Sequence, residues 1–486
     1  MRFNMLNTPE TAKRIGRRML QSLQGQYALC ACMAFYWAWQ IVFLQSPASL
    51  SSNLANKDIL MPQGSLLLLS SASTYAVLWL FHIKAAPLAR RPLYLIVITS
   101  FICLGSIATS LPLSSLDGHS GLETAGAIAM GIGAAAFVVE LGRIFAKLGP
   151  LSALTCGTIG IFGGSIMHML LVAAFSTFAP GILCLFPAAA VVCYARASAP
   201  FPLTSYRSHG LDQSMSFPSR YAATCFIQGL ALGNIATILS IQGSTLADHT
   251  PYFLAFTAGG LLVLLSSFVL NLDFNQLVYQ IGFTLMALSF VLCTCLPETP
   301  AASGFTMSVG HCFMYIVITC INSYFSNRMG CSPVWIVSLS TFFLVLGQVA
   351  GNLLVSILGG STFGVSVQSL ATIFSFALPA SAIFLLNNRN PLSGWGAVQP
   401  GEEHGLGSQS PVARLAKKYR LTPRETDVAE LLFRGRNKKR ISEDLGLAEE
   451  TIKSHMANIY RKLLVHSQQE LIDLVEEEQD QQQDTL

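Results

Sequence analysis

Charged residues are scarce in this chain of 486 residues, which excludes an ordinary soluble protein of this length. Only 11% of the residues are Asp, Glu, Lys or Arg, and 52% are hydrophobic, whereas soluble domains carry about 25% charged residues. The shortage is uneven. Residues 411–486 hold 13 basic and 14 acidic residues, 27 in all, and the 410 residues before them hold 16 and 11, again 27. The two parts therefore face two different solvents.

The chain also lacks a cysteine pattern that predicts disulfides or a metal site. All twelve cysteines lie between Cys30 and Cys331, mostly in apolar stretches, where cysteine behaves as a small hydrophobe. The pairs Cys30/Cys32 and Cys293/Cys295 would point about 200° apart on a helix and would not converge on one ion. No nucleophile–base pair, metal-ligand cluster or cofactor loop stands out. We therefore expect no enzyme, no catalytic residue, no metal and no cofactor.

Long apolar runs recur along the first part of the chain. A run of about 20 apolar residues is long enough to cross a hydrocarbon core of about 30 Å as a helix. Twelve such spans are predicted, of which the sixth is short. They lie near 27–46, 63–83, 92–111, 121–140, 151–172, 180–195, 221–241, 251–271, 276–296, 304–324, 333–356 and 367–387.

Basic residues between the spans predict their orientation. If both ends of the chain lie in the cytoplasm, fifteen Lys and Arg residues fall on the cytoplasmic side and only Lys57 falls outside, in agreement with the positive-inside rule. The basic N-terminus leads into 27–46 without a small-residue cleavage site, so this stretch is read as a transmembrane helix and not as a signal peptide. We expect a multi-pass protein of the bacterial inner (cytoplasmic) membrane with both termini in the cytoplasm.

The spans divide into two halves of six, 27–195 and 221–387, joined by the segment 196–220. This architecture resembles the major facilitator superfamily of transporters. That family often carries a basic motif with aspartate and glycine between its second and third helices. Here Arg90 and Arg91 match the basic character of the motif, but residues 82–91 contain neither aspartate nor glycine. The departure weakens the expectation of a transport cycle.

Polar side chains inside the spans are few. Ionisable groups within a membrane are candidates for function because burying them unpaired is costly. We take Glu123, beside the fourth span, and His311, in the tenth, as candidate ligand-sensing residues. The alternative is that Glu123, like Glu140 at the other end of the fourth span, lies at the water interface, and that His311 bonds a neighbouring helix. The other polar residues in or beside the spans are Glu140, His168, Gln228, Asn234, Gln348 and Asn352.

The last part of the chain has the pattern of a small helical domain. Thr422 to Glu425 form a capping box with proline at the first helical position, and 467–470 repeat the box before a last helix. A helix near 449–463 has one apolar stripe, made by Ile452, Met456, Ile459 and Leu463. A tight turn at Gly446 precedes this helix, and four short helices in this order predict a helix-turn-helix domain. The basic opposite face of the third helix suits the major groove, although an ordinary solvated face would look alike.

The residues of this domain resemble the LuxR/FixJ family signature. The matching stretches are 421–425, Gly435, Lys439, 441–442, Leu445, 451–455, Ile459 and 462–465. The resemblance implies that Lys453, Ser454 and Ala457 face bases and that Thr451, Lys439, Arg461 and Lys462 contact phosphates. Arg440 replaces the family's usual glutamate and should strengthen phosphate attraction. Ala448 replaces a capping serine, which removes about 1 kcal/mol, and Leu464 replaces a usual glycine.

The predicted fold is all-α, a twelve-helix transmembrane bundle of two major-facilitator-like halves followed by a four-helix LuxR-type domain. The predicted parts are a basic cytoplasmic N-terminus (1–26), the membrane domain (27–387), a linker rich in Gly, Pro, Ser and Asn (388–412), the helix-turn-helix domain (413–478) and a disordered acidic tail (479–486).

We interpret the protein as a membrane-bound one-component transcription regulator that senses a small molecule. The alternative is a secondary transporter with an appended regulatory DNA-binding domain. The partners that we expect are promoter DNA, membrane lipid, a second copy in a homodimer on DNA, a small-molecule inducer and RNA polymerase.

Overall fold

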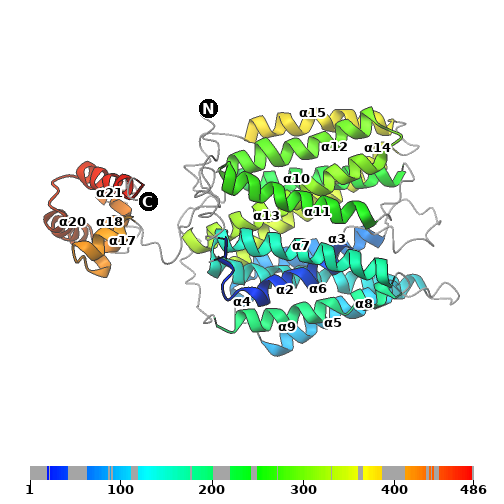
Figure 1. Ribbon diagram of the computed structural model, residues 1–486, viewed down its shortest axis with the longest axis horizontal. Helices are drawn as coiled ribbons and strands as arrows, with labels where there is room; N and C mark the ends of the chain where they lie inside the picture. The colour runs from blue at the N-terminus through cyan, green and yellow to red at the C-terminus, as the bar shows by residue number, and fades with distance from the viewer. Residues whose placement is uncertain are drawn as a thin grey trace. The chain divides into compact units, whose positions relative to one another are not determined.

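A computed structural model describes most of the chain, and every structural statement below concerns the residues that it describes. These are residues 19–20, 22–41, 63–85, 88, 91–110, 119–175, 178–200, 219–241, 249–270, 272–329, 331–359, 365–385, 411–433, 437–438, 441–442 and 448–483. Within them the secondary structure is helical, without strands. The chain divides into two compact units, Met1–Gly401 and Glu402–Leu486, which are considered separately (Figure 1).

The first unit is a bundle whose helices follow the predicted spans. Those of the first half are α2 (Tyr27–Gln40), α3 (Gln63–Leu80), α4 (His82–Ala85), α5 (Pro92–Ser110), α6 (His119–Leu148), α7 (Pro150–Ala174), α8 (Ala179–Leu183) and α9 (Phe186–Ser198). Those of the second half are α10 (Ser219–Ile241), α11 (His249–Leu264) with the π-helix η4 (Leu265–Val269), the π-helix η5 (Gln276–Gly282) leading into α12 (Phe283–Cys295), α13 (Pro300–Met329), α14 (Pro333–Leu358) and α15 (Val367–Leu385).

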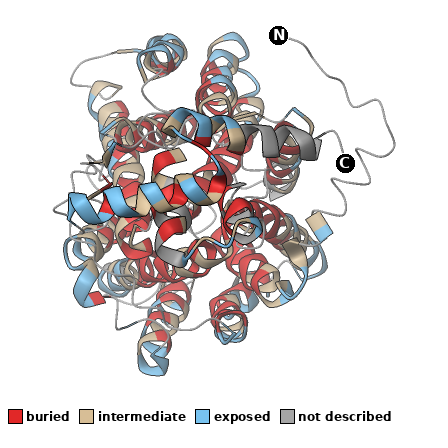
Figure 2. Ribbon diagram, turned by 90° about the vertical axis from the view of Figure 1, so that its left-hand side faces the viewer, coloured by how far each residue is buried: buried red, intermediate tan, exposed pale blue. Residues whose placement is uncertain are grey.

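Length and composition identify which helices can cross a membrane. Nine helices of the described residues are long and apolar enough, and two further apolar helices there, Leu66–Leu80 and Phe253–Val269, are shorter. The first predicted span coincides with α2, of which 14 residues are helical. Large apolar side chains on the lipid-facing helices stay exposed, as expected where the surroundings are hydrocarbon and not water. On α5 and α15 they include Leu93, Ile96, Leu104, Ile373, Phe376, Ile383 and Phe384. Figure 2 shows the buried residues gathered toward the middle of the bundle and exposed ones on its outer helices.

Glycine pairs bring two helices of each half into backbone contact. A Cβ added at Gly164 of α7 would lie 3.0 Å from the backbone nitrogen of Ala38 in α2, and one added at Gly351 of α14 would lie 2.9 Å from that of Asn234 in α10. Small residues four apart permit this approach between membrane helices. The equivalent contact therefore recurs in both halves, as expected of repeated units. The glycines involved are Gly160, Gly164, Gly347 and Gly351.

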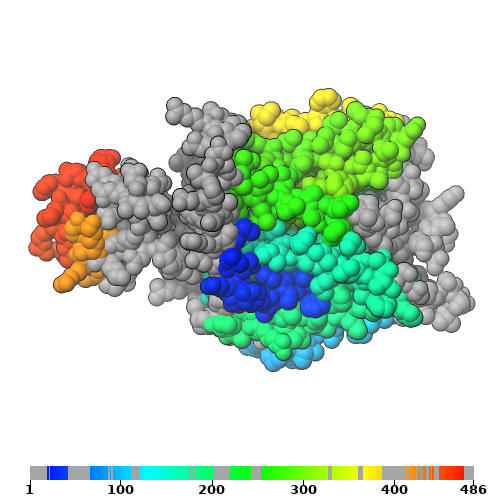
Figure 3. All heavy atoms as spheres, in the orientation of Figure 1, coloured from blue at the N-terminus to red at the C-terminus, as the bar shows by residue number. Residues whose placement is uncertain are grey.

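The two halves meet along α3 beside α14 and along α7 beside α11. Figure 3 shows the first half in blue to teal next to the second in green to yellow. At the end of the bundle where α6 and α13 both end, Ser323 Oγ donates a hydrogen bond of 2.7 Å to the carbonyl oxygen of Phe145. Nearby, a Cβ on Gly142 would lie 2.6 Å from Val337 Cγ2. The halves are therefore in close contact at this end.

The second unit is a small helical domain with its own core. Its helices are α17 (Pro411–Lys418), α18 (Pro423–Phe433), α20 (Glu449–Leu463) and α21 (Gln468–Gln483). The buried residues are Val412, Leu415, Val428, Ala429, Leu432, Ile441, Ile452, Ile459, Leu463, Val465, Leu471 and Val475. They come from all four helices, from Ile441 between α18 and α20, and from Val465 between α20 and α21. This unit therefore contains the core that it needs to fold alone.

Two ends of this unit differ from the expectation. Helix α17 begins at Pro411, within the segment expected to be a flexible linker, because Val412 and Leu415 contribute to the core. Helix α21 continues to Gln483, within the expected disordered tail. Its glutamate and glutamine residues are good helix formers and extend a helix that packing has already started.

Candidate nucleic-acid interface

The capping box predicted at the start of α18 is confirmed. The backbone nitrogen of Thr422 donates to Glu425 Oε2 at 2.7 Å, and that of Glu425 donates to Thr422 Oγ1 at 3.3 Å. These reciprocal bonds satisfy two of the amide groups that a helix start leaves without an intrahelical partner. The sequence therefore determines where α18 begins.

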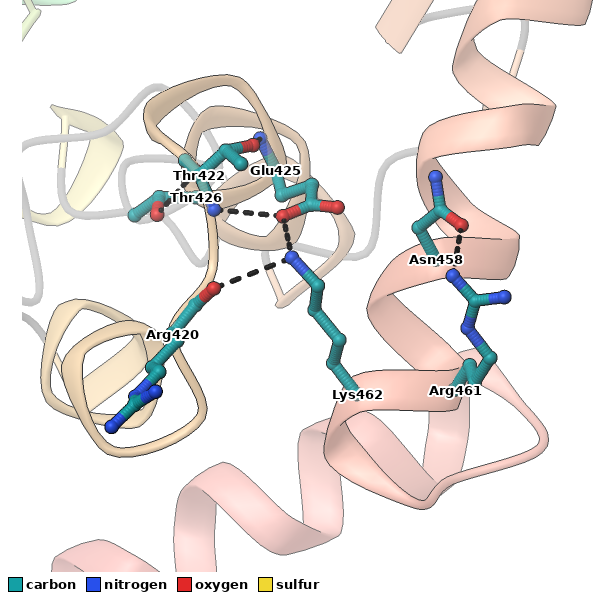
Figure 4. Close-up of polar contacts among 7 residues, drawn as sticks. All are labelled: Arg420, Thr422, Glu425, Thr426, Asn458, Arg461 and Lys462. Carbon is teal, nitrogen blue, oxygen red and sulfur yellow. Dashed lines mark hydrogen bonds and ion pairs between the residues drawn. The ribbon is translucent and has the colours of Figure 1, made fainter.

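The same glutamate also fastens α20 to α18. Lys462 Nζ lies 2.6 Å from Glu425 Oε2 and donates to the carbonyl oxygen of Arg420 at 3.3 Å (Figure 4). The Glu425 side chain is 6% exposed and that of Lys462 is 30% exposed. Burial by itself would raise the pKa of Glu425, but the hydrogen bonds from Lys462 and Thr422 outweigh it and lower the pKa. This ion pair holds the C-terminal end of α20 against the start of α18.

Helix α20 buries one face and exposes the other. Ile452, Ile459 and Leu463 are buried in the core, and Met456 packs against it, which confirms the predicted stripe. The opposite face is exposed and carries Thr451, Lys453, Ser454, Ala457 and Arg461. A helix fixed by its apolar face can present such short and basic side chains to a groove.

Both ends of α20 lack the residues that usually cap a helix. Ala448 occupies the N-cap position without a side-chain hydrogen bond, and the first turn carries Glu449 and Glu450, whose charges favour the positive end of the helix dipole. At the other end Leu464 adopts a left-handed conformation with φ 59° and is 81% exposed. Glycine adopts this conformation at little cost, whereas leucine is strained in it.

The basic groups on the exposed face have weak local partners. Lys453 Nζ lies 3.7 Å from Glu450 Oε2, and these side chains are 68% and 78% exposed; exposed pairs of this kind contribute little. Arg461 Nη2 donates to Asn458 Oδ1 at 2.9 Å. Lys453 and Arg461 therefore remain available to an anionic partner.

The structure brings five of the eight predicted DNA-binding residues together on the exposed face of α20. Lys462 lies on the same helix, but its ammonium group is held by Glu425. Lys439 and Arg440 lie outside the described residues, and so does the predicted turn at Gly446.

The last helix is capped as predicted and is also tied to α18. The backbone nitrogen of Glu470 donates to Ser467 Oγ at 3.1 Å, and Glu470 Oε2 accepts from the backbone nitrogen of His466 at 2.8 Å. Gln468 Nε2 donates to the carbonyl oxygen of Leu432 at 2.7 Å. The sequence pattern gave no sign of this last bond.

In the membrane unit, the two candidate ligand-sensing residues have different surroundings. Glu123 lies near the start of α6 and is partly exposed, whereas His311 in α13 is 4% exposed.

The membrane unit also contains a charged cluster that was not predicted from the sequence. Glu140 is fully buried, with Oε1 2.9 Å from Arg143 Nε, and its Oε2 accepts a 2.6 Å bond from the hydroxyl of Tyr194. The spacing of three residues between Glu140 and Arg143, one helical turn, was the signal for it.

The described His, Cys, Asp and Glu side chains are the candidates for metal binding and for disulfides. No group of three or more His, Cys, Asp or Glu side chains there could hold a metal ion. The described cysteines form no disulfide; Cys293 is buried and Cys295 is exposed, in agreement with their expected divergence on one helix.

Comparison with known proteins identifies the C-terminal unit. Residues 419–475 match the bacterial regulatory proteins of the LuxR family. The uncharacterized response regulatory protein YgeK of Escherichia coli (strain K12) is 38% identical over 60 residues, which are 12% of this chain and 41% of that protein. The chain thus spans less than half of this relative. Its C-terminal unit is a LuxR-type helix-turn-helix domain.

The membrane unit is similar in fold to transporters of known structure. The human organic anion transporter MFSD10 (TETRAN) aligns with a TM-score of 0.54 at 17% identity, over 78% of this chain and 100% of that one. A bacterial homologue of the iron transporter ferroportin in an outward-facing state aligns with a TM-score of 0.51 at 10% identity, over 75% of this chain and 98% of that one. The first unit therefore has a major-facilitator-like fold and makes the chain a multi-pass membrane protein.

Proposed function

We propose that the protein is a membrane-bound one-component transcription regulator, in which the LuxR-type domain binds promoter DNA and the membrane unit senses a small molecule. The observation that carries the proposal is the exposed face of α20, where Lys453 and Arg461 lie on the side opposite the core. Base edges and phosphates of a duplex match these side chains in charge and hydrogen-bonding capacity.

Each residue of this face has a proposed role. Lys453 and Ser454 reach base edges, and the methyl group of Ala457 makes an apolar contact there. Thr451 and Arg461 contact phosphates and set the register of the helix. Lys439 and Arg440 add phosphate contacts from the segment before α20.

Lys462 has a different role in the proposal. Its ammonium group lies 2.6 Å from Glu425 Oε2, and contact with a phosphate would require leaving this partner. We assign it to holding α20 at the angle at which the helix enters the groove.

The location follows from the need to reach DNA. Both termini lie in the cytoplasm and the bundle in the inner membrane of a bacterium, in agreement with the basic asymmetry of the connections. Two copies pair on DNA to read two half-sites about one helical turn apart. The bound dimer contacts RNA polymerase at the promoter.

The DNA-binding proposal is tested on the fragment 402–486, which has its own core. Lys453→Ala should lower the preference for the target site over random DNA by about 1–3 kcal/mol, because a base contact is lost. The control is Lys418→Ala, which removes an exposed lysine of α17 and should leave the preference unchanged. Equal losses on specific and random DNA would reject the base-reading role of Lys453.

The transporter alternative is motivated by the fold of the membrane unit and is tested on the full chain. Protein in liposomes should bind its inducer without accumulating it in response to a proton or sodium gradient. Gradient-driven uptake, together with target transcription that does not change when residues 402–486 are deleted, would establish the transporter instead.

A further inference from the structure

An aromatic cluster crosses the contact between the two halves of the membrane unit. The ring of Trp37 in α2 lies edge-on to two rings of the second half, with centroid distances of 5.4 Å to Phe256 in α11 and 4.9 Å to Tyr315 in α13. Trp37 itself is fully buried. Edge-to-face packing of this kind uses the faces and edges of aromatic rings, and a planar ring from a ligand could join it.

Three buried polar side chains lie about one helical turn to one side of this cluster. Gln40 follows Trp37 by three residues on α2, and His311 precedes Tyr315 by four on α13. The Trp37 side chain packs on Gly164 of α7, and His168 lies four residues after this glycine. These polar side chains are 8%, 4% and 0% exposed, in that order.

Helix directions place the three polar residues on the same side. Helices α2 and α7 run in the same direction, because Cys30 meets Gly160 and Ala34 meets Gly164. The C-terminal part of α13 lies beside the C-terminal end of α6, where Ser323 bonds Phe145. Helix α7 begins directly after α6, so α7 starts at the end of the bundle where α13 finishes, and the two run in opposite directions. One helical turn toward the C-terminus on α2 and α7, and one turn toward the N-terminus on α13, therefore reach the same level along the bundle, about 5.4 Å from the cluster.

Two atoms of this group lack a hydrogen-bond partner among the described residues, namely Trp37 Nε1 and Gln40 Oε1. An indole N–H is a donor only, and an amide oxygen is an acceptor. Residues three apart on a helix lie on one face, so both atoms belong to the same side of α2. Buried polar groups are normally satisfied, and a bound molecule could satisfy both.

The helices that supply the group carry no acidic side chain and no lysine. Helices α2, α7, α11 and α13 contain no Asp, Glu or Lys, and their one arginine, Arg328, lies at the end of α13. On the neighbouring helix α6, Glu140 is already paired with Arg143. A cation would lose its hydration here without an opposite charge. An anion could pair only with a protonated His168 or His311, and charging a buried imidazole is itself costly.

We propose that this contact between the halves binds an uncharged, ring-bearing molecule that both accepts and donates a hydrogen bond. The ring packs against Trp37, Phe256 and Tyr315, an acceptor of the ligand takes the Trp37 N–H, and a donor reaches Gln40 Oε1. The inference rests on the proposed function, because it names the class of molecule that the membrane unit senses.

Three probes of nearly equal shape test the charge of the ligand. Benzamide is neutral and carries both an acceptor and a donor, benzoate is an anion, and benzamidine is a cation. Binding is measured by saturation-transfer NMR on the full chain in lipid nanodiscs, with empty nanodiscs as the blank. Benzamide should bind saturably and at least tenfold more tightly than the other two. Equal or tighter binding of a charged probe, or no saturable binding of benzamide, would overturn the proposal.

A matched pair of variants tests the position of the site. Trp37→Phe keeps a ring and removes the N–H, and it should weaken benzamide binding about tenfold, the effect of one hydrogen bond. Trp39→Phe removes an N–H that is bonded to Ser106 Oγ at 2.8 Å and should change binding less than twofold. If Trp37→Phe does not assemble, Gln40→Met should produce the same loss. Equal effects of the site and control variants would reject this position.

Promoter binding by the same preparations separates this proposal from the proposed function. Benzamide binding that depends on Trp37, without any change in promoter occupancy, would support the site and count against the receptor function. A charged compound that changes promoter occupancy equally in wild type and in Trp37→Phe would support the receptor function and overturn the site.

Discussion

Leu464 ends α20 in a conformation that suits glycine, and its replacement by glycine should stabilise the C-terminal unit. The φ of 59° lies in the left-handed region, which costs an ordinary residue about 1–2 kcal/mol. Because the side chain is 81% exposed, its removal sacrifices little packing. Glycine loses about 0.5–1 kcal/mol through the greater freedom of the unfolded chain. The net gain should be about 0.5–1 kcal/mol.

Thermal unfolding of the fragment 402–486 measures this gain. For a domain of this size 1 kcal/mol corresponds to a change in Tm of about 4–8 °C, so Leu464→Gly should raise Tm by about 2–8 °C. Leu464→Ala is the control, because it removes the same exposed side chain but keeps the Cβ that causes the strain, and it should leave Tm nearly unchanged. A Tm of Leu464→Gly at or below that of Leu464→Ala would refute the argument from strain.

Three further predictions concern stability. Glu425→Gln should destabilise the fragment in urea at pH 7, and its difference from wild type should shrink as the pH falls below the ordinary glutamate pKa of about 4.3, because a carboxylate with a lowered pKa stabilises only while it is ionised; a constant difference would contradict this. Ala448→Ser should add about 1 kcal/mol in the same assay by capping α20, and no gain would show that the start of α20 is satisfied in another way. Gly164→Ala should reduce the yield of folded full-length protein in detergent, since its Cβ would lie 2.6 Å from the carbonyl oxygen of Ala34, whereas Gly157→Ala, with no neighbouring atom within 4 Å, should not; equal yields would contradict the tight α2–α7 contact.

Much of the architecture could be predicted from the sequence, because its signals are local. A run of about 20 apolar residues is sufficient to define a membrane helix, and α5, α7, α10 and α14 lie within a few residues of their predicted bounds. The count of twelve spans stays a prediction. Contacts between helices were harder to predict from the sequence. A Gly-x-x-x-Gly spacing predicts close packing, but it does not indicate which helix packs against the glycines.

The DNA-binding face was predictable for the same reason, and its supporting contacts were not. The stripe of Ile452, Ile459 and Leu463 fixes which side of α20 is buried, so its opposite side follows. The bond between Lys462 and Glu425 joins residues 37 apart in the chain. It depends on how α18 crosses α20, which no pattern within one helix contains. The phosphate contact that the LuxR/FixJ resemblance implies for Lys462 stays a prediction.

The glycine contact between α10 and α14 has a mechanical consequence for the end of the membrane unit. Helices in backbone contact cannot slide without collision, so these two must tilt together. Helix α15 packs on α12, where the rings of Phe290 and Phe374 lie 5.5 Å apart, and α12 in turn packs on α10. With its 19 residues α15 is roughly 28 Å long, so a tilt of about 10° displaces its far end by roughly 5 Å. Leu385, at the end of α15, is thus displaced more than residues near the pivot, so that a small rotation of one half is amplified at the last helix of the membrane unit.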